Sequence, residues 1–473
     1  MTDSHHLLVD SIGKRLSNPM PRCICIGVIT LCLLVPLGLV KGIIHERMHL
    51  YKEATGNIIG SWGWKQAING PALIIPYQIW QDRKDLVTEK VNGKEEKKEI
   101  VTREYLTRHK VILPSELVFD VLMDTEIRYR GIYKHALYTA PMTISGSFLL
   151  PTEKDFASNT TQIAWDKAWF CVGVSDLKTI VETTPLRWAE TSLAAYKPGT
   201  RAGELLGPGF HTEIPLMKRD VGTKHAFSLK LALRGSEGIS FTPVGENTAI
   251  TLKSAWPAPS FQGNLLPIER SVTDQGFTAR WAISNLTRTY PQIGDLEGRE
   301  YMDKKNDASS ITLFTAGVNL HEPVTLYRMV RRSVDYGILF IAVTFVALFA
   351  FELISRQRMH MVQYAMVGLS MSLFYMVLLS LAEHINFGLA FVAASAATVV
   401  MNSAYMAAVL QNRAKGLLLG VLLSILYAVL FSLLRMEDFA LLMGTGVVLV
   451  MMGALMFVTR KLPRSVVQTE ALP

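Results

Sequence analysis

The sequence predicts a membrane protein of the α+β class, with one N-terminal transmembrane anchor, a large, mainly antiparallel β domain and a C-terminal five-helix transmembrane bundle. Three observations predict it. The 473 residues are 49% hydrophobic and only 19% charged, with a mean hydropathy of +0.25, which is typical of chains that lie partly in lipid. Apolar runs of about 20 residues recur, mostly near the C-terminus. The polar middle of the chain alternates as strands do.

Six apolar runs are long enough to cross roughly 30 Å of hydrocarbon as helices that rise about 1.5 Å per residue. They cover residues 23–44, 334–354, 361–382, 387–410, 416–434 and 439–458. The connections among the last five are only a few residues long, which predicts an up-and-down bundle. The first run has no small-x-small cleavage site at its exit, so we expect a retained anchor rather than a signal peptide.

The runs divide the chain into five parts. We predict a cytoplasmic N-terminus at 1–22, an anchor at 23–44, an exported β-rich domain at 45–333, a five-span bundle at 334–459 and a cytoplasmic tail at 460–473. The orientation follows from the basic clusters that begin at Arg356, Arg413 and Arg460, because positive side chains favour the cytoplasmic connections. Both termini are therefore expected in the cytoplasm.

Four windows of the exported domain alternate between apolar and polar residues, as half-buried strands do. They are residues 73–80, 126–133, 227–233 and 248–252. Clusters of turn-forming residues, among them 207–209 and 243–247, separate such windows. The charged run 92–99 begins with Asn-Gly and is typical of a solvated hairpin tip. A mainly antiparallel β domain is the expected result.

The sharpest chemical motif is His45-Glu46-Arg47-Met48-His49, which fits the H-E-x-x-H pattern of zinc proteases. Two histidines one helical turn apart would bind Zn²⁺ while Glu46 activates water. However, Arg47 puts a cation beside the metal, no third ligand follows at a recognisable spacing, and polar residues are expected at the end of a span. A polar cuff at the membrane edge is the favoured interpretation, and no metal is expected.

Other catalytic and cofactor signatures are absent from the sequence, including the G-x-S-x-G elbow, the Walker loop and paired-cysteine metal motifs. The sequence therefore predicts a protein that is not an enzyme and holds no cofactor. The net charge of +8 would suggest nucleic acid in a soluble chain. Because membrane proteins often carry basic cytoplasmic edges, nucleic acid is excluded as a partner. The lipid bilayer and an unidentified component outside the cytoplasm are expected instead.

Four polar residues of the bundle would be costly if they faced lipid, namely Glu352, Glu383, His384 and Asn402. Glu352 can pair with Arg356 one turn later, and Glu383 and His384 can reach water. Asn402 lies deeper and is expected to make an interhelical hydrogen bond, in a run whose alanines let neighbouring backbones approach. These alanines are Ala390, Ala394, Ala397, Ala404 and Ala408. A proton pathway would need a chain of buried acids or histidines, which the sequence does not contain.

Ten segments, together with the order of anchor, exported domain and five spans, resemble the CreD family of bacterial inner-membrane proteins. They are GPALIIP at 70–76, GIY at 131–133, WPAPSF at 256–261, YGILFIA at 336–342, FE at 351–352, QY at 363–364, VGLS at 367–370, FY at 374–375, EH at 383–384 and FVTR at 457–460. The resemblance covers essentially the whole chain. Its strength comes from the agreement between these segments and the topology.

The resemblance implies an inner-membrane location, a periplasmic place for residues 45–333 and a part in cell envelope integrity. It also implies a regulon controlled by a two-component sensor and connected with tolerance of colicins and β-lactam stress. The family offers no established catalytic residues to carry over. Its pattern has aliphatic residues before Glu46-Arg47 and no second histidine, so His45 and His49 depart from it and the zinc hypothesis weakens further.

The segment 256–261 is a candidate interaction element. Pro257 and Pro259 fix φ near −65° and remove two hydrogen-bond donors, so the segment must be a rigid extended or turn element. Trp256 and Phe261 are then packed on the β core as a strand-end corner, which is the favoured interpretation, or displayed as a rigid aromatic binding edge.

We therefore expect a non-enzymatic envelope protein whose exported domain contacts a periplasmic or cell-wall component while the bundle anchors it. The competing hypothesis is a transporter of small solutes or lipids that uses the bundle. The glycines of the last run fit helix packing at least as well as a pathway, and the odd number of spans shows no inverted repeat. A membrane zinc protease at His45 and His49 is a third, weaker hypothesis.

Overall fold

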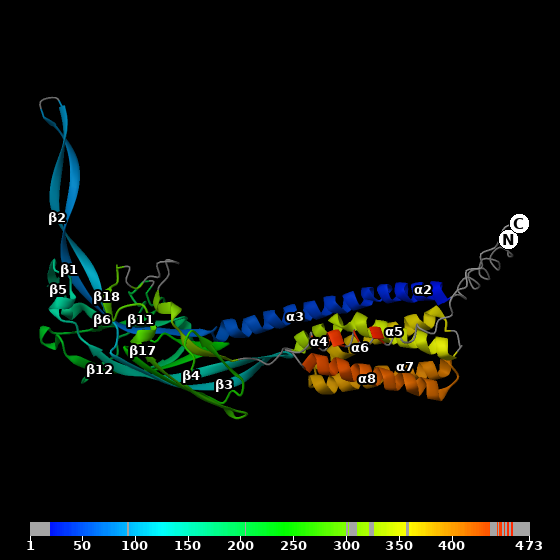
Figure 1. The fold of residues 1–473 in the computed structure, drawn as a ribbon. Coiled ribbons are helices and arrows are strands. Elements are labelled where there is room, and N and C mark those ends of the chain that lie inside the picture. The colour runs from blue at the N-terminus through cyan, green and yellow to red at the C-terminus, as the bar shows by residue number, and fades with distance from the viewer. Residues whose placement is uncertain are drawn as a thin grey trace. The chain divides into compact units, whose positions relative to one another are not determined.

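In a computed structural model, the chain forms two compact units (Figure 1). The helical unit combines the residues up to Glu53 with those from Val324 onward, and the β unit runs from Ala54 to Pro323. The β unit is thus shorter at both ends than the predicted domain at 45–333. The structure describes residues 19–91, 94–203, 205–298, 301, 310–320, 326–355, 359–435 and scattered positions between 442 and 456.

The multi-pass character of the chain is confirmed. The described helices are α2 (Pro19–Cys32), α3 (Leu34–Trp62), α4 (Leu326–Asp335), α5 (Gly337–Ser355), α6 (Met361–Ala382), α7 (Phe387–Val409) and α8 (Arg413–Arg435). Within the described residues, four segments are long and apolar enough to cross a membrane, and a fifth results if α4 and α5 are one bent span. The sixth predicted span, 439–458, lies for the most part outside the described residues.

The N-terminal helix is longer than the predicted anchor at 23–44, because helix continues through α3 to Trp62. Buried or half-buried side chains recur along α3 after the apolar run. They are Ile44, Met48, Tyr51, Thr55 and Ile59. This spacing of three or four residues follows one face of a helix. The predicted anchor ends at Ile44, where the hydropathy of the sequence falls. The helix instead continues for as long as buried side chains recur on one of its faces.

The second predicted span, 334–354, is not one straight helix. α4 and α5 meet at a bend of 41°. Gly337 begins α5, and a Cβ atom at this position would lie 3.1 Å from both Leu37 Cδ2 and the Tyr375 hydroxyl oxygen. The missing side chain therefore lets α3 and α6 pack closely against the bend.

The β unit contains two sheets. Its strands are β1 (Gln66–Val91), β2 (Lys94–Ile112), β3 (Glu116–Arg130), β4 (Tyr133–Leu149), β5 (Thr160–Ile163), β6 (Ala168–Val174), β7 (Ile180–Thr183), β8 (Leu186–Trp188), β9 (Thr191–Leu193), β10 (Lys197–Pro198), β11 (Gly209–Ile214), β12 (Lys224–Ser236), β13 (Gly238–Phe241), β14 (Asn247–Ser254), β15 (Pro259–Gly263), β16 (Glu269–Thr273), β17 (Gly276–Ser284), β18 (Ile293–Asp295) and β19 (Ala316–Leu320).

The first sheet has the order β10-β11-β6-β1-β13-β19-β15, with β2 and β5 paired to β1 and β18 paired to β2. The second has the order β16-β17-β14-β3-β4-β12-β8-β9, with β7 beside β12. Only β1 with β13 and β3 with β14 run parallel among the described pairs. The prediction of a mainly antiparallel β domain is therefore confirmed.

Aromatic side chains from the two sheets form one core between them. The ring of Phe119 on β3 lies 5.0 Å from that of Phe241 on β13, and Phe148 on β4 lies 6.2 Å from Phe170 on β6. A core of this size does not depend on a disulfide. Cys171 is buried in it as a free thiol, and burial raises the pKa of this thiol.

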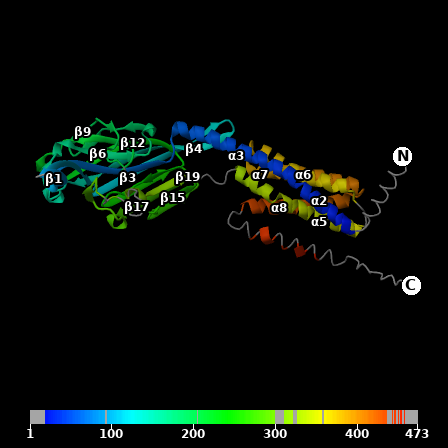
Figure 2. The ribbon, with the colours of Figure 1, turned by 90° about the horizontal axis from the view of Figure 1, so that it is seen from above.

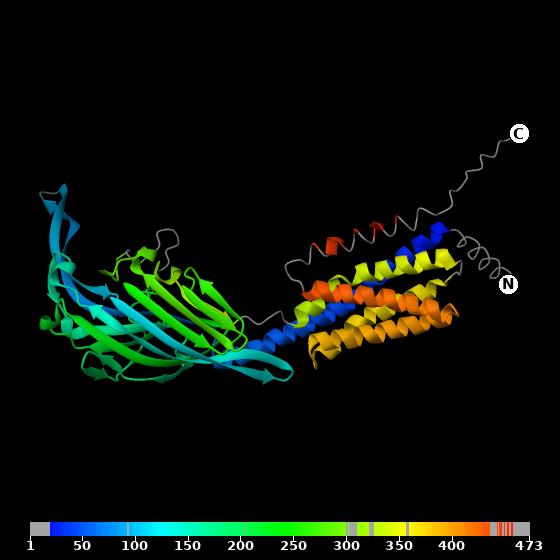
Figure 3. The same cartoon turned by 60° about the horizontal axis from the view of Figure 1, so that its bottom comes forward.

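A two-stranded arm extends from the sandwich (Figures 1 and 3). It consists of residues 81–91 of β1 and 94–104 of β2, paired from Gln81 opposite Glu104 to Val91 opposite Lys94. No other described strand pairs with this stretch, which is about 35 Å long at roughly 3.4 Å per residue. The pairing confirms a hairpin around the charged run 92–99, although residues 92 and 93 themselves lie outside the described ones.

A second hairpin joins β3 to β4. The predicted strand window 126–133 is wrong as a single strand, because β3 ends at Arg130 and β4 begins at Tyr133. Gly131 between them has φ +62°, a conformation that glycine adopts without strain. Arg130 and Tyr133 are paired across this turn, so the predicted window combines residues of two strands.

Candidate functional site

The contact of α2 and α3 with the rest of the helical unit is the candidate site, and we call it the anchor seam (Figure 2). At one end of the seam, Arg22 of α2 forms an ion pair with Glu352 of α5. The Tyr364 hydroxyl of α6 donates to the other oxygen of Glu352 at 3.0 Å, and Arg22 donates to the Met359 carbonyl at 2.6 Å. The Glu352 side chain is only 6% exposed, so this cluster satisfies a buried carboxylate from two helices.

A similar cluster lies near Glu383, at the end of α6. The Tyr327 hydroxyl of α4 donates to Glu383 Oε1 at 3.1 Å, and Arg47 Nε of α3 lies 3.7 Å from the same oxygen. The rings of Tyr51 and Tyr327 are 5.9 Å apart. The Glu383 side chain is 8% exposed. Each cluster thus joins an arginine of the N-terminal helices to a glutamate and a tyrosine of the C-terminal ones.

Close packing fills the seam between these clusters. A Cβ atom on Gly368 of α6 would lie 2.2 Å from Leu33 Cδ1, so Leu33 occupies the space that a side chain would need. Leu37 packs in the same way on Gly337. Lys41 Nζ lies 2.8 Å from Asp335 Oδ1, but both side chains are about half exposed. The seam therefore fixes the position of the anchor by shape as well as by charge.

The sequence indicated the glutamate of each cluster but not the arginine that pairs with it. It singled out Glu352 and Glu383, but it paired Glu352 with Arg356, which lies outside the described residues, whereas the structure gives Arg22. Arg47 was assigned to a polar cuff. The signal that could have found the arginines is charge balance, since a buried glutamate needs a cation and Arg22 and Arg47 flank the anchor.

His384 does not join the cluster of its neighbour Glu383. Its side chain is exposed, with Nδ1 3.0 Å from the Ser380 carbonyl oxygen. His45, Glu46 and His49 are exposed on α3. Within the described part of the chain, no three His, Cys, Asp or Glu side chains come together as a metal site requires.

Asn402 makes the interhelical hydrogen bond that its sequence context predicts. The Ser370 hydroxyl of α6 donates to Asn402 Oδ1 at 2.8 Å, and Asn402 Nδ2 donates to the Thr398 carbonyl at 2.9 Å. Asn402 is 2% exposed. Both polar groups of its amide are thus partnered inside the bundle.

The predicted small-residue face of the same helix needs a correction. Ala390 and Ala394 are buried, but Ala397, Ala404 and Ala408 are exposed. A helix turns about 100° per residue, so the five alanines lie within about 80° of one another on one face, but this face is buried only towards the start of the helix. The close approach of α7 to α8 uses other residues, because a Cβ atom on Gly416 would lie 2.5 Å from Ala407 Cβ and one on Gly420 would lie 2.5 Å from Ser403 Oγ.

The segment 256–261 packs as a strand-end corner. The Trp256 indole N–H donates to the Ala258 carbonyl at 3.1 Å. Phe261, on β15, lies edge-on to Phe277 and Trp281, at ring distances of 5.8 and 6.0 Å. Pro257 and Pro259 shape this corner, and both aromatic rings are half-buried against the core.

Polar side chains of β18 and the residues after it hold the root of the arm. The Tyr77 hydroxyl donates to Asp295 Oδ1 at 2.7 Å, and Lys110 Nζ lies 2.6 Å from the same oxygen. Burial, together with the hydrogen bond to Asp295, raises the pKa of the Tyr77 phenol above its ordinary value. The His109 backbone N–H donates to Glu297 at 3.0 Å. The arm thus leaves the sandwich from a fixed base.

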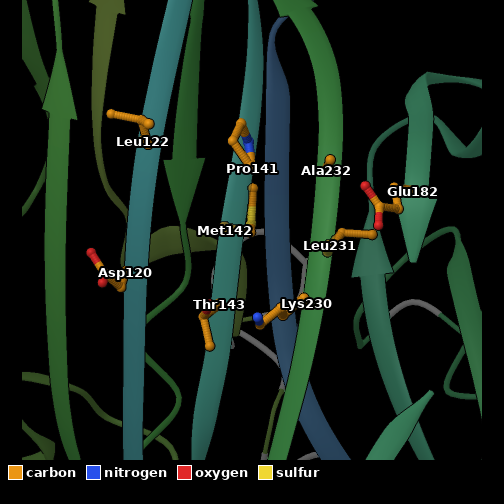
Figure 4. A pocket seen from close by; sticks show the side chains of 9 residues that line it. All are labelled: Asp120, Leu122, Pro141, Met142, Thr143, Glu182, Lys230, Leu231 and Ala232. Atoms are coloured by element: carbon orange, nitrogen blue, oxygen red, sulfur yellow. The ribbon is translucent and has the colours of Figure 1, made fainter. Parts of the chain in front are cut away.

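Two hollows in the described parts of the chain are large enough to compare with ligand sites. One of about 350 Å³ lies on the second sheet, where Asp120, Lys230 and Glu182 come from three strands and do not converge on one point (Figure 4). The other, of about 600 Å³, lies between α7 and α8 and is lined mainly by small and aliphatic residues, among them the exposed Ala404 and Val421. It opens on the outside of this helix pair, which is the geometry of a surface groove.

The two comparisons with known proteins agree over most of the chain. A family model described as "CreD: Inner membrane protein CreD" matches residues 18–463. The "Inner membrane protein CreD" of Escherichia coli (strain K12) is 32% identical over 433 residues, which cover 91% of this chain and 90% of that relative. The matched range includes both clusters of the anchor seam.

Proposed function

Because the chain belongs to the CreD family of inner membrane proteins, we propose that it is a non-enzymatic protein that supports envelope integrity and stress tolerance. In this proposal the β unit lies in the periplasm and binds an envelope component, while the helices anchor it. The positive-inside pattern supports this orientation, with both termini in the cytoplasm. The activity is one of binding rather than catalysis.

The arm is the observation that carries this proposal. A two-stranded ribbon is marginally stable by itself, and no other described strand pairs with the arm, so the pairing of the sandwich does not explain its length. Ion pairs between its strands keep it in register. They join Asp82 to Arg103 at 3.3 Å, Arg83 to Glu104 at 3.0 Å and Lys84 to Glu99 at 2.8 Å. These ion pairs between the strands support a role for the arm in reaching a partner.

The arm also offers two modes of contact. Val101 is 56% exposed, and Tyr105, at its root, is 63% exposed, which gives a partner apolar surface. The outer backbone edges of residues 81–91 and 94–104 pair with no described strand. An extended segment of a partner can add to such an edge through main-chain hydrogen bonds.

Shortening the arm tests the proposal. Replacing residues 83–102 by Asn-Gly joins Asp82 to Arg103 through a two-residue turn that preserves their pairing. We expect the shortened protein to accumulate and melt as the intact one does but to lose envelope-stress tolerance. The matched control is the double variant Lys84→Gln, Glu99→Gln, which removes one ion pair and keeps the arm, and it should retain tolerance. Full tolerance with a folded, shortened arm would refute the proposal.

A further inference from the structure

The hairpin of β3 and β4 ends in exposed apolar side chains. Ile127 is 50% exposed, Tyr129 is 69% exposed and Ile132 is 46% exposed, all within a few residues of the turn. Side chains nearer the sandwich on the same strands, such as Met123 and Tyr138, are fully buried. The hairpin therefore presents apolar groups where the core no longer covers them.

Basic side chains alternate with these apolar ones. Arg128 is neutralised by Glu126, whose Oε1 lies 2.9 Å from Arg128 Nε. Arg130 and Lys134 are exposed, and neither makes an ion pair with a described residue. The tip thus carries two uncompensated positive charges next to aromatic and aliphatic groups. This combination is typical of segments that lie at the interface of an anionic bilayer.

The base of the hairpin is fixed to the last residue of α3. The Trp62 indole N–H donates to the Tyr138 carbonyl at 3.1 Å, and the Arg128 guanidinium stacks 4.0 Å from the centre of the Trp62 ring. α3 begins inside the apolar run at Leu34. From the end of that run at Ile44, the helix to Trp62 is only about 27 Å long. The residue that holds the base of the hairpin is therefore no more than about 27 Å along the helix from the end of the apolar run.

We propose that residues 127–134, the hairpin tip, form a second membrane contact that binds the surface of an anionic phospholipid bilayer. Arg130 and Lys134 pair with lipid phosphates, while Ile127, Tyr129 and Ile132 enter the boundary between headgroups and acyl chains. This contact concerns lipid alone and is independent of the partner that the arm binds.

Depth measurements on the full chain test the contact. A nitroxide is attached at residue 132, or at the 90% exposed residue 286 as an aqueous reference, after the four native cysteines are replaced. The protein is placed in nanodiscs of phosphatidylglycerol with phosphatidylcholine, or of phosphatidylcholine alone. With phosphatidylglycerol, the label at 132 should lie about 5 to 10 Å below the lipid phosphates, and the label at 286 should lie in water.

Removing the positive charge should release the tip. Arg130→Gln with Lys134→Gln should return the label at 132 to water, whereas the matched control Lys253→Gln with Arg280→Gln, on other strands of the same sheet, should not. High salt should weaken the contact of the unaltered tip, which tests the role of charge without any substitution. A label at 132 that is as aqueous as one at 286 in anionic nanodiscs would overturn the proposal. Equal behaviour of the two charge variants would overturn it as well.

Discussion

Asn402 shows how a polar side chain is kept inside a helix bundle. Its hydrogen bond from Ser370 replaces the partner that lipid cannot supply. We predict that Asn402→Ala costs only about 0.6 to 2 kcal/mol of unfolding free energy, because the helix in lipid finds other partners when the bundle comes apart. Unfolding in detergent of this variant, of Ser370→Ala and of the double variant measures the coupling. Loss of stress tolerance with unchanged stability would contradict a structural role.

Burial differs along the alanine face of α7, and two alanines one turn apart can be compared directly. Ala394 is fully buried between helices, so Ala394→Leu should destabilise the bundle by about 1 to 3 kcal/mol through overpacking. Ala397 is exposed on the same helix, and Ala397→Leu is the matched control, expected within about 0.5 kcal/mol of the original protein. Thermal unfolding of the two variants in one detergent gives the comparison. Equal losses would place both alanines in helix contacts.

At the scale of single residues, sequence reasoning identified which side chains needed partners but not which partners they have. Asn402, Glu352 and Glu383 stood out because polar groups are expensive in an apolar run. Arg22 lies 330 positions from Glu352. No local pattern connects two residues that only the packing of helices brings together.

At the scale of elements, the ion pairs of the anchor seam differ in what they contribute. Arg22 and Glu352 are 12% and 6% exposed, whereas Lys41 and Asp335 are each about half exposed. Removing one partner of a buried pair leaves the other charge without compensation. Glu352→Leu should therefore cost about 3 kcal/mol of unfolding free energy.

A double-mutant cycle tests this prediction. Arg22→Leu with Glu352→Leu should recover most of the stability that Glu352→Leu loses, because no unpaired charge is left. Asp335→Leu is the control and should cost less than about 1 kcal/mol, as exposed pairs do. Additive losses at Arg22 and Glu352 would mean that the two side chains do not depend on each other.

Element boundaries were predictable where one signal dominated. Hydropathy located α6 closely, because its apolar run and its helix coincide. The same signal ended the anchor at Ile44, although the stripe that includes Thr55 and Ile59 carries the helix on to Trp62. The arm was recognised only at its tip, since the pairing that defines its length joins residues of β1 and β2 that are far apart in sequence.

At the scale of the whole molecule, the orientation gives the next prediction. A reporter that is active only in the periplasm should work when fused after Gly131 or Glu383, because both follow an odd number of predicted crossings. It should fail when fused after Arg413, which begins α8 in a basic connection. An active fusion at Arg413 would contradict the predicted topology of both termini.

Binding of an envelope component by the arm of the β unit is the centre of the proposed function. Photo-crosslinking in living cells tests it most directly, with the reactive residue in place of Tyr105 or Val101 and, as a control, of Leu286, which is 90% exposed elsewhere on the β unit. We predict that Val101 on the arm and Tyr105 at its root yield the same adduct, that mass spectrometry identifies it as an envelope component, and that Leu286 yields none. Equal adducts at all three positions, or none at Tyr105 and Val101, would contradict the claim.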